Sequence, residues 1–254
     1  MRRHDGKQAS FVKLKVASWN MAHWTHRSVA DKTWDYLDRG IAADIALLQE
    51  SAPTPDRQKQ GCVWREIGGT RRWGSCVMTR NLSLTEVHLE RNDYPGALTV
   101  GEVTLPDEST LIVVSIYGLL DVHDYSITTL HRMLSDLTPL FNGELQEHGR
   151  PRVIFGGDLN ASTQFDPKQR NNSHRIFFQR LEDFGLVDCQ GAFSKERPRT
   201  LRRAKNDSPW VNDYMFASEN LAGKVLSYEV IENPEILALS DHNPLVVTFD
   251  LEEE

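Results

Sequence analysis

Short apolar runs, each bounded by polar or turn-forming residues, recur along the chain and predict a protein rich in strands. Val12, Leu14 and Val16 alternate with lysines, which is the period of a strand with one buried face. The continuous apolar character of residues 41–50 predicts a strand that is buried on both faces. Further strands are predicted over residues 63–67, 75–78, 98–105, 111–117, 153–155, 186–188, 214–217, 225–231 and 245–251, and the turn at 106–108 joins two of them into a hairpin.

Three segments have the spacing of apolar residues that an amphipathic helix needs. Residues 28–40 begin at a serine that can cap a helix and end at a glycine, which is a good stop signal. From Ser126 onward apolar residues follow at intervals of three and four, and Pro139 is expected to bend or end that helix. Residues 173–184 form the third helix. The alternation of hairpins with helices predicts an α/β fold of two packed sheets flanked by helices.

The length of 254 residues fits one large domain, and no linker, repeat or low-complexity tract divides the chain. We expect a flexible N-terminus over residues 1–10 and a single domain over residues 11–254. Cys62, Cys76 and Cys189 are far apart in the sequence and form no Cys-x-x-Cys pair, which argues against a disulfide framework and a structural zinc site. Reduced thiols, with no signal peptide and no apolar stretch of membrane-spanning length, predict a soluble cytoplasmic protein without a membrane partner.

The net charge of −7 gives the chain no overall attraction to nucleic acid, so a polyanion would have to meet a local basic patch. Residues 195–205 carry six cations and one acid, and Arg71 and Arg72 lie next to Trp73. Both a solvated surface and a phosphate-binding surface fit these residues. Trp24, Trp73 and Trp210 could stack on unpaired bases, although core packing is the favoured role for each. The candidate substrate contacts are Arg72, Trp73, Arg199, Arg202 and Arg203.

Acid, amide and imidazole side chains stand at the ends of several predicted strands, where a sheet protein gathers its functional groups. Six motifs result, namely Ser18-Trp19-Asn20, Leu48-Gln49-Glu50, Ile116-Tyr117, Gly157-Asp158-Leu159-Asn160, Asn212-Asp213-Tyr214 and Ser240-Asp241-His242. In this order they resemble the endonuclease/exonuclease/phosphatase superfamily, whose founding member is deoxyribonuclease I, and they span nearly the whole chain. The resemblance implies a four-layer α/β sandwich with the site at one end of its two sheets.

The resemblance implies a metal centre. Glu50 would be the main metal ligand, with Asn20 and Asp241 close to the ion. The fold would gather four carboxylates, those of Glu50, Asp158, Asp213 and Asp241. Buried carboxylates repel one another unless a cation neutralises them. Hard oxygen ligands suit Mg²⁺ or Mn²⁺, whereas zinc would need more histidine or cysteine.

The resemblance also implies the catalytic roles of five residues. Asp158 would orient or deprotonate the attacking water, and Asn160 would position that water or the phosphate. His242 would hydrogen-bond the phosphate and would be held in its tautomer by Asp213. Tyr117 would donate to a phosphate oxygen. A tyrosine at this position resembles the abasic-site and retroelement endonucleases, whereas deoxyribonuclease I, the sphingomyelinases and the deadenylases have a histidine.

Two positions depart from the pattern of the abasic-site endonucleases. Ala22 stands where those enzymes usually have an acid, which puts a second metal ion in doubt. Asn212 stands where they tend to carry an arginine before the Asp-Tyr pair, so abasic-site activity is not assumed.

The resulting hypothesis is a metal-dependent phosphodiesterase that hydrolyses nucleic acid, with DNA favoured, and leaves 5′-phosphate and 3′-hydroxyl ends. One alternative is a phosphatase or phosphodiesterase for a small or lipid-borne phosphate such as an inositol phosphate. A binding module that has lost catalysis is the other. The motifs are shared across these substrates and do not distinguish DNA from RNA, internal from terminal attack, or one metal ion from two. No obligate protein partner is implied.

Overall fold

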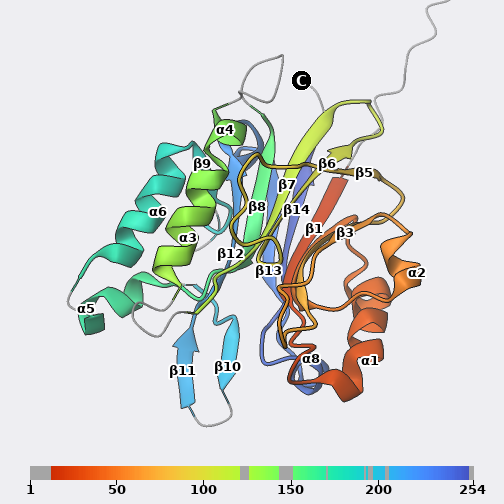
Figure 1. Ribbon diagram of the computed structural model, residues 1–254, viewed down its shortest axis with the longest axis horizontal. Coiled ribbons are helices and arrows are strands. Elements are labelled where there is room, and N and C mark those ends of the chain that lie inside the picture. Colours follow the sequence, from red (N-terminus) through yellow and green to blue (C-terminus); the bar gives the residue numbers. More distant parts are fainter. Residues whose placement is uncertain are drawn as a thin grey trace, which may run out of the picture.

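Two six-stranded sheets face each other at the centre of the computed structural model (Figure 1). The first sheet has the order β13 (Val225–Val230), β14 (Leu245–Asp250), β1 (Lys13–Asn20), β2 (Ile45–Ser51), β4 (Gly74–Thr79) and β3 (Cys62–Trp64). The second has the order β5 (Ser83–Glu86), β6 (Leu98–Thr104), β7 (Thr110–Tyr117), β8 (Val153–Asp158), β12 (Asp213–Ser218) and β9 (Leu186–Asp188).

The structure describes residues 13–120, 126–142, 151–169, 171–191, 193, 197–203 and 206–251, without the side chains of 168–169, 203 and 206–210. The N-terminal segment 1–10, which the sequence predicts to be flexible, lies outside the described residues.

Helices cover the outer face of each sheet and complete four layers (Figure 1). The main ones are α3 (Ile127–Asp136) and α6 (Ser173–Asp183) on the second sheet, and α1 (Ala30–Asp35) and α8 (Pro234–Leu239) on the first. Shorter helical segments are η1 (Arg27–Val29), η2 (Tyr36–Ile41), α2 (Pro55–Gln58), α4 (Thr138–Phe141), η3 (Thr163–Phe165), α5 (Asp166–Gln169) and α7 (Glu219–Ala222).

Three apolar cores hold the four layers together. Leu47 and Val113 belong to the core between the two sheets, to which both sheets contribute. Phe177 belongs to the core between the second sheet and its helices, and Trp34 belongs to the core between the first sheet and its helices. Burial of large apolar side chains on both faces of each sheet favours this layered arrangement. The four-layer α/β sandwich that the sequence predicted is therefore confirmed.

The strand β1 differs from its prediction because it is buried on both faces. Leu14 and Val16 point into the core between the sheets, and Ala17 and Trp19 point into the outer core. The alternation with lysines that predicted one polar face covers only the start of the strand. β1 lies between β14 and β2, in the middle of the first sheet, so most of its length has no solvent-facing side.

The boundary between η2 and β2 was also predicted wrongly. Ile41 was expected to begin a strand, but it ends η2, and β2 begins at Ile45. Ala42 adopts the left-handed conformation with φ 52°, which ends the helical segment. The Asp44 carboxylate then accepts a hydrogen bond from the Lys15 amide at 2.8 Å, and the Lys15 ammonium donates to the carbonyl oxygen of Ile41 at 2.5 Å. These contacts come from a distant part of the chain, so the local apolar pattern does not contain them.

The basic segment that was expected to be a loop contains a hairpin. β10 (Leu201–Arg203) and β11 (Asn206–Trp210) pair antiparallel as a separate two-stranded sheet. Figure 1 shows this hairpin extending from one end of the sandwich. Among the described residues, no helix combines the length and the apolar character that crossing a membrane requires.

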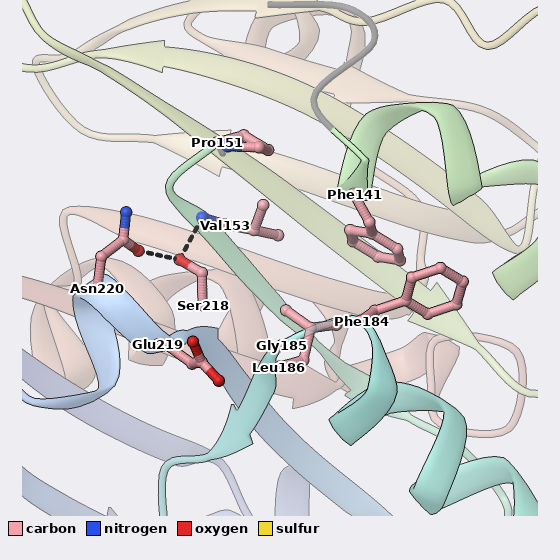
Figure 2. Close-up of a pocket in the computed structure, with 9 residues that line it drawn as sticks. All are labelled: Phe141, Pro151, Val153, Phe184, Gly185, Leu186, Ser218, Glu219 and Asn220. Atoms are coloured by element: carbon pink, nitrogen blue, oxygen red, sulfur yellow. Dashed lines mark hydrogen bonds between the residues drawn. The ribbon is translucent and has the colours of Figure 1, made fainter. Parts of the chain in front are cut away.

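A small hollow lies at the other end of the sandwich (Figure 2). Phe141 and Phe184 line its apolar side. On its polar side the Ser218 hydroxyl accepts a hydrogen bond from the Val153 amide at 3.0 Å and donates to the Asn220 side-chain oxygen at 2.6 Å. Val153 is the first residue of β8, so the hollow is separated by the length of that strand from the acid at its far end. These two hydrogen bonds join the start of β8 to the end of β12 and to α7.

Candidate active site

The strand directions bring the sequence motifs to one end of the sandwich. β1 and β2 run parallel, as do β7 and β8, so Asn20, Tyr117 and Asp158 stand at the carboxyl ends of their strands. β12 runs antiparallel to β8, and its first residue, Asp213, pairs directly with Asp158. The same geometry places His242 beside them, because β14 runs antiparallel to β1 and His242 precedes it. Asp213 thus lies at the start of its strand, whereas Asn20, Tyr117 and Asp158 lie at the ends of theirs.

A glycine lets β7 and β8 approach closely next to these residues. Gly157 has φ +156°, and a Cβ atom at this position would lie 1.8 Å from the carbonyl oxygen of Ile116. The next pair along the two strands is Tyr117 with Asp158. Only glycine allows this spacing and conformation without strain, so Gly157 sets the distance between the two site residues.

Backbone strain is concentrated around the site. Ala22, Glu50 and Asn160 all have positive φ values, of 49°, 47° and 48°. At Glu50 the pairing of β2 with β4 is interrupted between Leu48 and Ser51. Non-glycine residues hold this conformation only where their surroundings impose it, and such positions cluster at functional sites. The interruption turns Glu50 out of the regular strand and towards the pocket.

His23, which the sequence analysis did not identify, hydrogen-bonds to the backbone at Glu50 and at Ala52. Its amide donates to the carbonyl oxygen of Glu50 at 3.1 Å, and its Nδ1 accepts from the amide of Ala52 at 3.1 Å. Burial lowers the pKa of His23 to about 4, against a smaller opposing effect of Asp31. The ring is therefore neutral at physiological pH, and Nδ1 remains an acceptor. No local sequence signal marks this role, because it depends on the pairing of the segment after β1 with the end of β2.

His242 lies between two buried carboxylates. Its Nδ1 is 2.9 Å from Oδ2 of Asp213, and its Nε2 is 3.7 Å from Oδ2 of Asp158. The Ser240 hydroxyl accepts the His242 amide at 3.0 Å, and the Trp19 indole donates to the His242 carbonyl at 3.0 Å. The imidazole is thus fixed both by its ring contact and by its backbone.

The electrostatics of the site favour a charged imidazole. Burial by itself would lower the pKa of His242, but the negative charges of Asp213 and Asp158 outweigh it and raise the pKa to about 10. Burial raises the pKa of Asp158 to about 7, although the positive charge of His242 opposes this. His242 is therefore an imidazolium at neutral pH, and Nε2 carries a proton that it can donate to an anion.

Tyr117 and Glu50 form a second pair in the site. Burial raises the pKa of Tyr117 well above its usual value, and the charges of Glu50 and Asp158 raise it further, so the hydroxyl keeps its proton. That hydroxyl donates to the Glu50 carboxylate. Burial also raises the pKa of Glu50, while His242 and the hydrogen bonds from Asn20 and Tyr117 lower it.

Three asparagines support Asp158, and one of them, Asn20, connects the first sheet to the second. Asn20 donates from Nδ2 to Oδ2 of Asp158 at 2.9 Å, and its Oδ1 accepts from the Ala22 amide at 3.0 Å. Asn160 donates from its backbone amide to Oδ1 at 3.0 Å and from Nδ2 to Oδ2 at 3.3 Å. Asn212 donates to Oδ1 of Asn160 at 3.3 Å. Asn212 appeared in the sequence only as a departure from a motif. In the structure it holds the side chain of Asn160, which in turn donates to Asp158.

The clustered acids of the site are suited to a divalent cation. Ligand atoms of Asp158, Asp213 and His242 lie within 4.8 Å of one another. Glu50 and Asp241 lie close enough to share charge effects with His242, and Asp241 is exposed to solvent. A set dominated by carboxylate oxygens fits Mg²⁺ or Mn²⁺ chemistry. The predicted metal ligand Asn20 already uses its Oδ1 to accept the Ala22 amide, so a cation would have to share that oxygen.

The pocket at this site has an apolar and aromatic wall beside its acids. Trp24 and Leu120 line it and are 56% and 54% exposed, unlike most large apolar side chains. Arg71 also lines the pocket, with its guanidinium 5.8 Å from the ring centre of Trp73. Trp73, a predicted substrate contact, is only 4% exposed and packs edge-on against Tyr117 with ring centres 5.3 Å apart.

The basic residues predicted to contact substrate are arranged differently from expectation. Arg72 pairs with Glu66 at 3.2 Å and does not line the pocket, whereas its neighbour Arg71 does. Arg199 and Arg202 both pair with Glu232, at 2.9 and 2.5 Å. The side chain of Arg203 lies outside the described residues.

Residues 199–202 support the site through the side chain of Thr200 and the backbone of Leu201 and Arg202. Thr200 Oγ1 accepts from the amides of Asn212 and Asp213 at 3.0 and 3.1 Å. The Arg202 amide donates to the Asp241 carbonyl at 2.8 Å, and Leu201 forms a bridge with His242. The basic segment therefore supports the candidate site from one side, and the β10–β11 hairpin extends from this end of the molecule (Figure 1).

No family model and no curated protein matches the chain. Solved structures match it over nearly its whole length. An abasic-site endonuclease from Archaeoglobus fulgidus is 20% identical, with a TM-score of 0.67 over 94% of this chain and 100% of that one. A 3′–5′ exonuclease from Neisseria meningitidis is 18% identical, with a TM-score of 0.67 over 93% and 100%.

The endonuclease domain of TRAS1, a telomere-specific non-LTR retrotransposon, is 18% identical, with a TM-score of 0.65 over 94% of this chain and 100% of that domain. At identities this low, the structural match establishes the fold, and the activity has to be argued from the residues of the site. The chain therefore has the fold of the endonuclease/exonuclease/phosphatase structures, as the sequence motifs implied.

Proposed function

We propose that this protein is a member of the endonuclease/exonuclease/phosphatase superfamily and a metal-dependent phosphodiesterase that hydrolyses nucleic acid, with DNA as the favoured polymer. Water attacks phosphorus and leaves 5′-phosphate and 3′-hydroxyl ends. The observation that carries the proposal is the position of His242, 2.9 Å from Asp213 and 3.7 Å from Asp158, at a pocket that Glu50 and Tyr117 also line. We propose that residues 11–254 act as one domain, because both sheets share one core.

His242 and Asp213 act on the phosphate. The imidazolium binds a phosphoryl oxygen through Nε2, because Nδ1 faces Asp213. The buried carboxylate fixes the orientation of the ring and favours its charged form. Tyr117 keeps its proton and donates to a second oxygen when it leaves Glu50. Because Asp213 already orients the His242 ring, this donor stabilises the developing negative charge without reorganisation during the reaction.

Asp158 acts on the water. Its pKa of about 7 is near the operating pH, which suits a general base. Asn20 and Asn160 donate to the same Asp158 oxygen and leave the carboxylate little freedom to rotate. Glu50, Asp241 and Asn20 would hold Mg²⁺ or Mn²⁺, which when bound would supply charge stabilisation to the phosphoryl group.

The pocket wall supports a nucleic acid substrate. Trp24 presents a solvent-exposed ring next to the acids, and a base attached to the reacting phosphate can stack on such a ring. Arg71 adds a cation to the same wall, where a neighbouring phosphate can pair with it. Among structures of the same fold, one is described as a 3′ phosphatase bound to a product DNA hairpin.

A cleavage assay tests the proposal. Wild-type protein and Asp158→Ala are incubated with plasmid, single-stranded DNA, RNA and an abasic-site duplex, in Mg²⁺, in Mn²⁺ and with chelator. We expect cutting of DNA that requires both the metal ion and Asp158. Asp56→Ala is the matched control, because the Asp56 side chain is 88% exposed and pairs only with the exposed Lys59 among the described contacts.

The products and the rival substrates complete the test. End-labelled products should carry 5′-phosphate and 3′-hydroxyl groups, and products that end in 3′-phosphate would contradict the mechanism. Hydrolysis of an inositol phosphate or a phospholipid with all polymers left intact would replace the nuclease by a phosphatase. Binding of nucleic acid that is unchanged in Asp158→Ala, with no turnover by either protein, would indicate a binding module.

A further inference from the structure

Cys62 and Cys76, which are far apart in the sequence, lie in contact in the first sheet. Their strands β3 and β4 pair antiparallel, with Cys62 opposite Met78 and Trp64 opposite Cys76. Residues two apart in a strand share a face, so both cysteines lie on the same side of the sheet. The two Sγ atoms are 3.1 Å apart. Both cysteines are free thiols in this structure.

The two thiols differ in accessibility. β3 is the edge strand of its sheet, and Cys62 is only partly buried there. Cys76 is fully buried in the outer core of the first sheet, among side chains that include Trp19 and Leu48. An oxidant that arrives from solvent therefore meets Cys62 first, with Cys76 behind it.

The chemistry of the two thiols differs in the same direction. Contact with the Cys76 thiol lowers the pKa of Cys62, and the charge of Arg57 lowers it further, against the opposing effect of burial. Burial raises the pKa of Cys76 well above its usual range. The thiolate is the reactive form of cysteine, so Cys62 is the nucleophile of the pair.

A structural zinc site does not explain the pair. Zinc in structural sites takes four protein ligands. Within the part of the chain that the structure describes, the only cluster of three or more potential ligands is Asp158, Asp213 and His242, which belongs to the active site. The two thiols thus lack the further ligands that would complete a metal site there.

We propose that Cys62 and Cys76 form a redox modification site at which hydrogen peroxide converts the two thiols into a disulfide. The Cys62 thiolate attacks the peroxide, an S–O bond forms as the O–O bond breaks, and the departing hydroxide takes up a proton to become water. The Cys76 sulfur then attacks the Cys62 sulfenic acid, an S–S bond forms, and the second oxygen leaves as water with the Cys76 proton. The two thiols lose two electrons, and the peroxide gains them.

The location of the pair connects this site to the catalytic strands. Cys76 is paired with Leu48 across β4 and β2, and Glu50 follows Leu48 in the interrupted part of that pairing. Bridging would tie the edge strand β3 to the strand that flanks β2. The reaction itself uses no active-site residue, so it can be tested independently of the proposed phosphodiesterase activity.

Thiol counting and mass spectrometry test the proposal. Fully reduced full-length protein is treated with hydrogen peroxide, denatured, and labelled with a thiol reagent. We expect the three free thiols of the sequence to fall to one, with the loss of two hydrogen atoms in intact mass and a cross-linked peptide that contains Cys62 and Cys76. A reductant should restore all three thiols.

Variants separate this pair from the third cysteine. Cys189→Ser is the matched control and should form the disulfide as the wild type does, because Cys189 is buried in the core between the sheets. Cys62→Ser should form no intramolecular disulfide, and its position on the edge strand makes it the variant least disruptive to folding. Oxidation of Cys62 to sulfinic acid while Cys76 stays a free thiol would overturn the proposal, as would a disulfide that involves Cys189 or joins two chains.

Discussion

Replacing Gly157 by alanine should force β7 and β8 apart beside the active site. A Cβ atom at Gly157 would lie 1.8 Å from the Ile116 carbonyl oxygen, whereas real Cβ contacts essentially never fall below 3.0 Å. The obstructing atom belongs to the backbone, so no side-chain rotation relieves the clash. The residue would also have to keep a φ of +156°, which suits glycine alone.

The loss in the free energy of unfolding follows from the steric clash and from the unfavourable backbone conformation. Overpacking of a close-packed interior costs about 1–3 kcal/mol. A non-glycine residue in a sparsely populated backbone conformation costs about 1–3 kcal/mol more. The reduced entropy of the unfolded chain offsets only about 0.4–1 kcal/mol of this. We therefore expect Gly157→Ala to lower the free energy of unfolding by about 3 kcal/mol, within a range of about 1–6 kcal/mol, and to lower activity because the adjacent pair is Tyr117 with Asp158.

Urea denaturation of the two proteins measures the difference. Gly223→Ala is the matched control, because a Cβ atom there meets no atom within 4 Å and its φ is −66°. That variant should be as stable as the wild type or slightly more stable. A free energy of unfolding for Gly157→Ala within about 1 kcal/mol of the wild type would refute the argument that this glycine sets the strand spacing.

Three further predictions concern the site. In metal-free protein, Asp213→Asn should lower the pKa of His242 from about 10 towards its ordinary 6.5, and an unchanged imidazole titration by NMR would contradict the electrostatic account. In the wild type the pKa of His242 is higher in the folded state than in the unfolded state. The charged imidazole therefore adds its full stability below about pH 6.5 and loses it as the pH rises through about 10. The difference in the free energy of unfolding between the wild type and Asp213→Asn should shrink over that pH range. Trp24→Ala should raise the KM for single-stranded DNA several-fold while the melting temperature stays constant, since the side chain is 56% exposed, and Trp24→Phe should restore binding; equal KM values in all three proteins would exclude stacking. Mg²⁺ or Mn²⁺ should raise the melting temperature of the wild type by neutralising the clustered acids, with a smaller rise in Glu50→Gln, and the same rise in both proteins would argue against Glu50 as the main ligand.

The sequence predicted most of the elements and the motif residues that the structure brings together. The hairpin over 98–117 and the helix over 173–184 were recovered within a residue or two, because their apolar spacing reflects one buried face. The motif residues from Asn20 to His242 were identified by their position at strand ends, and the structure brings them to one end of the sandwich. Their individual roles are still proposals.

Residues whose role depends on a distant partner were missed. His23 holds the backbone at Glu50 through two hydrogen bonds, and nothing in its local sequence indicates this. Trp24 and Trp73 were treated alike, yet one is exposed at the pocket and the other is buried against Tyr117. Arg199 pairs with Glu232, an acid 33 positions away along the chain, so the basic segment has less free charge than its composition suggested.

The sequence by itself determined the fold class, the order of the strands along the chain and the set of candidate site residues. These depend on local periodicity and on residue type, and both can be read from the sequence without knowing which distant residues come into contact. The tertiary structure decided which of these residues meet, because strand direction and register pair positions without regard to their separation in the chain. It joined Asp213 to Asp158, Cys62 to Cys76 and the end of β1 to the strained turn at Glu50. The carboxylates of Asp213 and Asp158, which only the folded chain brings to His242, then gave the imidazole its charge, and burial raised the pKa of Asp158.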